Sequence, residues 1–203
     1  MNIGVTDQTN YRTNYAGYTA TGDAKTDAFY SGLSSAVEKA DGKGKGDILG
    51  LTMIPYSDQM SYGMTAKYSD KSTADDPVIR ICSNFGGIQR YYDVYVNEVN
   101  PRNASQLEMF ALSCYMDDQG ITDSGTFGSY SKMKVYVSNA AYNGLCPDLQ
   151  DTANLSVKLD WITVLQEMAQ EYLKTPKAYT QYLSADNIAK SLEMWSQKFA
   201  IYS

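Results

Sequence analysis

The residues able to do chemistry are few in this 203-residue chain, and their spacing matches no common catalytic pattern. The chain has no histidine, which excludes serine–histidine and cysteine–histidine catalysis, histidine-ligated zinc and an imidazole base. The three cysteines, Cys82, Cys114 and Cys146, have no activating residues in a recognisable motif beside them. Since Cys82 and Cys114 fall in expected core elements, we predict structural thiols.

Two short motifs resemble functional sites but lack the residues that would complete them. Residues 129–132 match the S-x-x-K pattern of penicillin-recognising enzymes, yet the S-D-N and K-T-G companions are missing. Three aspartates surround Gly120, but Ile121 stands where an EF-hand needs an oxygen ligand, and no glutamate closes the loop. We therefore predict no catalytic residue, no metal site and no cofactor.

Composition indicates a globular protein with an unusual number of tyrosines. The chain is 43% hydrophobic and 20% charged, and it contains 18 tyrosines. Tyrosine combines a large apolar ring with a polar hydroxyl, which suits core edges and protein interfaces. The net charge of −6 and the scattered arginines disfavour nucleic acid as a partner. The expected partner is a protein, including a second copy of this chain.

The sequence indicates no targeting or membrane segment. Its amino terminus has neither a basic start nor an apolar run, and no stretch approaches the roughly 18 apolar residues of a membrane helix. The odd number of cysteines is typical of reduced thiols. These features predict a cytoplasmic protein without a membrane span, although export by a route without a cleavable signal stays open.

The stretch from residue 78 to residue 120 carries the clearest structural signals. Residues 78–83 are a short stretch rich in β-branched side chains, residues 84–87 form a turn, and residues 88–99 alternate apolar and polar side chains, which predicts an antiparallel hairpin over 78–99. Ser105 and Glu108 have the spacing of a capping box at the start of a helix, and Gly120 stands where that helix should stop. The sequence therefore predicts a hairpin that leads into a capped helix over about 104–118.

Elements on both sides of this stretch follow from apolar spacing. Residues 48–55 are apolar enough for a buried strand or a helical turn, and the even spacing of large residues over 60–68 favours a strand. Helices are expected over 26–39, 129–143, 157–174 and 186–201, with a separate short helical piece through Tyr179 and Leu183. These elements predict an α+β fold, in which a small antiparallel sheet packs against several carboxy-terminal helices.

Residues 1–25 form an expected arm ahead of a single domain over 26–203. The arm is rich in small polar residues, and Tyr11, Tyr15 and Tyr18 are its large side chains. Such a segment buries too little apolar surface to fold alone, so we expect its tyrosines to anchor it to a protein surface. The sequence leaves open whether that surface belongs to the same chain or to a neighbour.

Part of the chain resembles a known group of proteins. The residues that carry the resemblance begin with DDPVIRI and YDVYVNEVNPRNASQLEMFALSCYMDDQG and continue with SYSKMKVYVSNAAYNG and LDWITVLQEMAQEYL, within about 75–183. They are similar to a family of small proteins from Gram-positive gut anaerobes of the Clostridia type. The resemblance implies a bacterial source and a shared hairpin–helix body with a variable amino-terminal arm. It carries no established activity.

These observations predict a non-enzymatic interaction or structural protein. It would self-assemble through a tyrosine-rich surface that comprises Tyr11, Tyr15, Tyr18, Tyr91 and Tyr95. Two alternatives stay open: a small hydrolase that uses carboxylates assembled in the fold, and a protein that binds a ligand in an aromatic groove.

Overall fold

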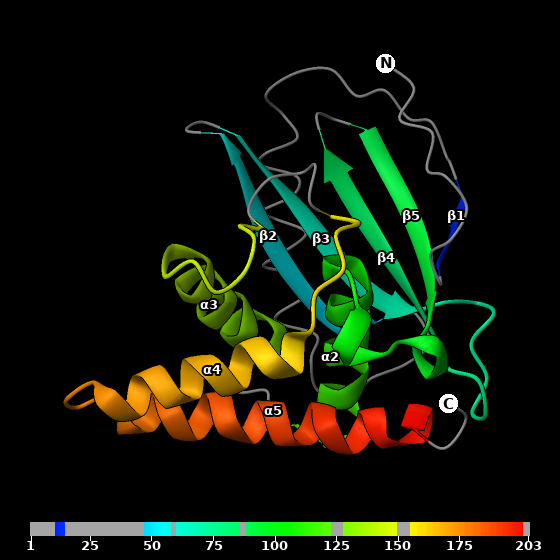
Figure 1. Ribbon diagram of the computed structural model, residues 1–203. Coiled ribbons are helices and arrows are strands. Elements are labelled where there is room, and N and C mark those ends of the chain that lie inside the picture. The colour runs from blue at the N-terminus through cyan, green and yellow to red at the C-terminus, as the bar shows by residue number, and fades with distance from the viewer. Residues whose placement is uncertain are drawn as a thin grey trace.

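A computed structural model of the chain describes residues 11–14, 47–57, 60–85, 88–122, 128–149 and 155–200. Within these ranges, five antiparallel strands form one sheet and four α-helices lie to one side of it (Figure 1). The predicted α+β fold is therefore confirmed. The helix expected over 26–39 falls outside the described residues.

The sheet has the strand order β1-β5-β4-β3-β2, so the first two strands of the chain lie at opposite edges. The strands are β1 (Tyr11–Asn14), β2 (Gly50–Ser57), β3 (Met60–Tyr68), β4 (Val78–Phe85) and β5 (Ile88–Tyr95). The apolar segment near residues 48–55 is a strand and not a helical turn. The strand expected over 60–68 is also confirmed, and its Met64 is fully buried.

The predicted hairpin is present, and its first strand is longer than the sequence suggested. Strand β4 continues to Phe85, two residues into the segment expected to be the turn, and Phe85 pairs with Ile88. The second strand ends at Tyr95, because a 3₁₀ helix over Val96–Glu98 replaces the last part of the strand expected to reach Val99.

The four helices are α2 (Gln106–Asp118), α3 (Gly128–Tyr142), α4 (Trp161–Lys174) and α5 (Tyr179–Ala200). The capping box of α2 is confirmed. The Ser105 hydroxyl accepts a hydrogen bond from the Glu108 amide at 3.3 Å, and the Glu108 carboxylate accepts one from the Ser105 amide at 2.7 Å. Gly120 follows with a φ of +67°, the left-handed conformation in which helices commonly stop.

Two carboxy-terminal helices begin at positions that differ from the prediction. Helix α4 starts at Trp161 instead of residue 157, because Leu159 forms a β-bridge with Ala104 and Asp160 caps the helix by accepting from the Thr163 amide at 3.0 Å. Helix α5 starts at Tyr179 and continues without a break. The separate helical piece and the last helix predicted from the sequence are therefore one helix.

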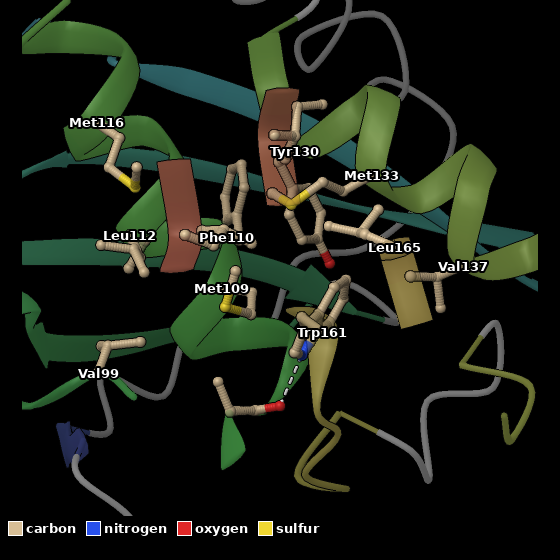
Figure 2. Close-up of a cluster of buried hydrophobic side chains, with 14 of the residues drawn as sticks. Val99, Met109, Phe110, Leu112, Met116, Tyr130, Met133, Val137, Trp161 and Leu165 are labelled. Atoms are coloured by element: carbon tan, nitrogen blue, oxygen red, sulfur yellow. Dashed lines mark hydrogen bonds between the residues drawn. The ribbon is translucent and has the colours of Figure 1, made fainter. Parts of the chain in front are cut away.

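The core lies between the sheet and the helices. Helix α2 packs against β3, β4 and β5, and α3 packs against β2, while α4 and α5 form an antiparallel pair beneath them (Figure 1). Phe110, Tyr130 and Trp161 form an aromatic chain through three helices, with ring centroids 5.0 Å and 6.2 Å apart (Figure 2). The Trp161 ring nitrogen donates to the Ala104 carbonyl at 2.8 Å, so its polar group is satisfied in the core.

Candidate interaction surface

The sheet face that points away from the helices carries a polar and aromatic row on its central strands. Strands β4 and β5 alternate, so Ile79 and Val94 face the helices while Arg80 and Asp93 occupy the other face. Tyr91 and Tyr95 lie on the same face as Asp93, at alternate positions of β5. We call the face formed by Arg80, Cys82, Tyr91, Asp93 and Tyr95 the outer face.

Asp93 is the charged centre of the outer face, and it is only 1% exposed. Arg80, its register partner on β4, donates from Nε to Oδ1 at 2.7 Å and from Nη2 to Oδ2 at 3.0 Å. Lys71 adds a bond to Oδ2 at 2.8 Å from the loop between β3 and β4. A buried carboxylate is stable only when such partners replace its water, and this carboxylate has two cations.

The pKa of Asp93 reflects the balance between burial and these partners. Burial raises the pKa of a carboxyl group because it disfavours the charged form. Here the hydrogen bonds and charges of Arg80 and Lys71 outweigh burial, and the pKa of Asp93 lies below its usual value. The same contacts raise the pKa of Arg80. The group is therefore a fixed ion pair at neutral pH and is poorly suited to act as a general acid.

Strand β1 extends the outer face at the edge of the sheet. It pairs with β5, and Arg12 stands opposite Asp93 while Asn14 stands opposite Tyr91. Residues 11–14 of the expected arm therefore pair with β5 of the same chain in the structure.

The structure places the predicted surface tyrosines in different positions. Tyr91 and Tyr95 share the outer face and are partly exposed. Tyr91 donates to the Gln89 side chain at 3.1 Å and hydrogen-bonds with Cys82. Tyr11 is the register partner of Val94, a position in the row that faces the helices, so the sheet does not group it with the other two. Tyr15 and Tyr18 lie outside the described residues.

Two cysteines, both predicted to be core residues, have different surroundings. Cys114 is buried between α2 and β2, and burial raises the pKa of its thiol well above the usual value. Cys82 is only partly buried and lies on the outer face opposite Tyr91. Burial also raises the pKa of Cys82, so it resembles a structural thiol more than an activated nucleophile.

Sequence reasoning missed the ionic pair of Arg80 and Asp93. The turn predicted over residues 84–87 shifts the hairpin register and places Arg80 opposite Tyr91. The observed pairing of Phe85 with Ile88 places Arg80 opposite Asp93 instead. The signal that could have found the pair is the adjacent Gly86 and Gly87, which favour a two-residue hairpin connection.

The opposite edge of the sheet is covered by a helix. Lys134 of α3 extends its ammonium group to β2, where it donates to the Met53 carbonyl and lies 3.4 Å from the Thr52 hydroxyl. Burial lowers the pKa of Lys134. An edge strand protected in this way is a poor template for pairing with another chain.

A groove on the helical side of the molecule is a second feature of the described residues. Its volume is about 660 Å³, and it lies between α3, α5 and the end of α2. Its neutral polar lining consists of Thr122, Thr180, Gln181, Ser184, Asn187 and Ser191. Within the described lining as a whole, Tyr136 is aromatic and no residue carries a carboxylate. This groove thus lacks the acid pair that the hydrolase alternative requires, and that alternative stays a prediction.

Comparisons with known proteins add no family to these observations. No protein-family model, curated protein or solved structure matches the chain. Among the described residues, no group of three or more cysteines or acids is placed to hold a metal ion. None of the helices in the described ranges is both long and apolar enough to span a membrane.

Proposed function

We propose that this protein is a non-enzymatic interaction or structural protein that binds a second copy of itself through the outer face. The observation that carries the proposal is the arrangement of Tyr91 and Tyr95 on both sides of the buried, ion-paired Asp93. Both tyrosines are partly exposed, and both lie on β5, which is held in the sheet by its pairing with β4.

The outer face favours the proposal because it is already ordered before a second copy binds. Tyrosine is enriched at protein interfaces because its ring buries much area while its hydroxyl finds a partner at the rim. Arg80 is already engaged by Asp93 and its side chain is only 21% exposed, so its charge needs little additional desolvation. A pre-organised strand loses little conformational entropy when it binds, which favours association.

Light scattering after size-exclusion chromatography tests this proposal. The double variant Tyr91→Ala/Tyr95→Ala should weaken self-association at least tenfold, because truncating aromatic anchors typically costs more than 1 kcal/mol each. The matched control is Tyr142→Ala, since Tyr142 is 92% exposed on α3, away from the outer face. Circular dichroism would confirm that the variants fold. Equal association by the double variant and the wild type would refute this function.

The groove favours a second candidate function, the binding of a small molecule that has both apolar surface and hydroxyl or amide groups. Its volume falls within the range of small-molecule sites, and its described lining combines Ile121, Leu183 and Ile188 with neutral polar side chains and Lys132. NMR titration with a panel of monosaccharides and short amides would test it. Shifts confined to groove residues and lost in Asn187→Leu would favour binding, whereas no saturable shift would exclude these ligands.

A further inference from the structure

The groove between α3 and α5 has a shape that suits an elongated ligand. Its α5 side runs from Thr180 to Ser191, and a helix rises about 1.5 Å per residue, so that side is roughly 16 Å long. Tyr136 and Ile188 are nearly buried, which places them at the bottom of the groove, whereas Leu183 is exposed at its rim. The groove therefore offers apolar surface at two depths to a ligand that lies along α5.

Lys132 is the one charged residue in the described lining of the groove. It precedes Tyr136 by one turn of α3, so both side chains lie on the same side of that helix. Lys132 is also the lysine of the S-x-x-K pattern, but Ser129 of that pattern is not among the described lining residues. Ser129 is buried, and its hydroxyl donates to Asp117. Lys132 thus belongs to the groove, whereas Ser129 belongs to the junction between α2 and α3.

The acids closest to the groove in sequence are engaged elsewhere. Asp117 accepts hydrogen bonds from the hydroxyls of Thr122 and Ser129, and from the Ser129 amide at 2.8 Å. Asp186 of α5 forms an ion pair with Lys190 at 2.6 Å. Neither carboxylate is in the described lining, so the side chains of that lining carry a net positive charge. An anionic group on a ligand complements such a lining.

We infer that the groove binds an amphiphilic carboxylate, an elongated molecule with one carboxylate group, an amide and an apolar chain. The inference rests on the second candidate function, because it names the ligand class of the same groove. The Lys132 ammonium group pairs with the carboxylate. Ser184 and Asn187 lie about one turn apart on α5 and offer hydrogen bonds to the amide. Leu183 and Ile188 pack against the apolar chain.

Calorimetric titration of the full chain with N-octanoylglycine and with its uncharged counterpart, N-octanoylglycinamide, tests the inference. The two probes differ only in the group that should meet Lys132. The acid should bind at least tenfold more tightly, because a charge-assisted hydrogen bond is stronger than a neutral one. Lys132→Met should reduce the affinity for the acid to that for the amide and leave the affinity for the amide unchanged.

The matched control is Lys174→Met, since the Lys174 side chain is 70% exposed at the end of α4 and lies outside the described lining. This variant should bind both probes as the wild type does, and circular dichroism would confirm that both variants fold. Backbone NMR shifts on adding the acid should fall on groove residues.

Equal affinity for the two probes, with shifts in the groove, would overturn the carboxylate but leave the groove as a binding site. A preference for the acid that survives Lys132→Met would overturn the assignment of Lys132. Shifts outside the groove, or no saturable binding of either probe, would overturn the inference as a whole. The second candidate function would still be decided by its own panel of monosaccharides and short amides.

Discussion

Asp93 illustrates how a charged residue can lie buried in the middle of a sheet. The bidentate contact from Arg80 and the ammonium of Lys71 replace the hydrogen bonds that water would provide. A buried ion pair of this kind contributes little to stability beyond offsetting its own desolvation cost. Removing the carboxylate alone is costly, because it leaves both cations without their buried partner of opposite charge. The pair therefore favours the register in which Arg80 stands opposite Asp93.

Asp93→Asn should lower the free energy of unfolding by about 2 to 3 kcal/mol at neutral pH, because it leaves Arg80 and Lys71 facing a neutral amide. The measurement is urea denaturation followed by circular dichroism. The matched control is Asp70→Asn, since Asp70 also contacts Arg80, at 3.3 Å, but its side chain is 97% exposed. The control should change stability by less than about 0.5 kcal/mol. Equal effects of the two variants would contradict the role given to Asp93.

The cost of Asp93→Asn should depend on pH in a definite direction. The pKa of Asp93 is lowered in the folded state, so its stabilising effect is fully present above the unfolded value of about 3.9. The effect is lost as the pH falls through the folded pKa, where the carboxyl group becomes protonated. Urea midpoints of the wild type and the variant should therefore converge as the pH falls below about 4. A difference that stays constant as the pH is lowered further would exclude this linkage.

At the scale of elements, the contact between α2 and β2 depends on close packing at Gly50. A side chain at Gly50 would overlap the Sγ atom of buried Cys114, while the Phe110 ring lies 3.7 Å from the same point. Glycine is therefore required there by the neighbouring thiol. The constraint joins two elements that are far apart in the sequence, and it keeps the helix close to the sheet.

Gly50→Ala should destabilise the protein by about 2 kcal/mol, because the new methyl group forces Cys114 out of its position. In a Cys114→Ala background the same substitution should be neutral or stabilising, since the overlapping atom is gone and alanine suits a strand better than glycine. A double-mutant cycle measured by thermal and urea unfolding gives the coupling between the two sites. Additive effects would show that the contact does not limit packing.

The elements most readily predicted were those with strong local signals. The capping box at Ser105, the stop at Gly120 and the apolar spacing of α4 and α5 all depend on residues close in sequence. The boundaries that were wrong depend on contacts between distant segments. Helix α4 starts late because Leu159 pairs with Ala104, which no local pattern indicates.

At the scale of the whole molecule, the order of the strands in the sheet could not be predicted from the sequence. Nothing in residues 11–14 indicates that they join the edge of a sheet beside β5, 80 or so positions away. The candidate surface was predicted in part, since Tyr91 and Tyr95 do share a face. Its ionic centre, the pair of Arg80 and Asp93, depends on the hairpin register. The pair could therefore be identified only in the structure.

Among the described residues, the two edges of the sheet have different neighbours. Lys134 of α3 donates to the Met53 carbonyl of β2, whereas β1 pairs with β5 at positions that include Tyr91 and Asp93.

Sedimentation equilibrium of the full chain over a wide range of concentrations tests self-association most directly. The proposed association of two copies through the outer face predicts that the weight-average mass rises with concentration from 22.5 kDa towards twice that value. Tyr91→Ala/Tyr95→Ala should shift that rise to at least tenfold higher concentration. A mass of 22.5 kDa at every concentration for the wild-type chain would contradict the account.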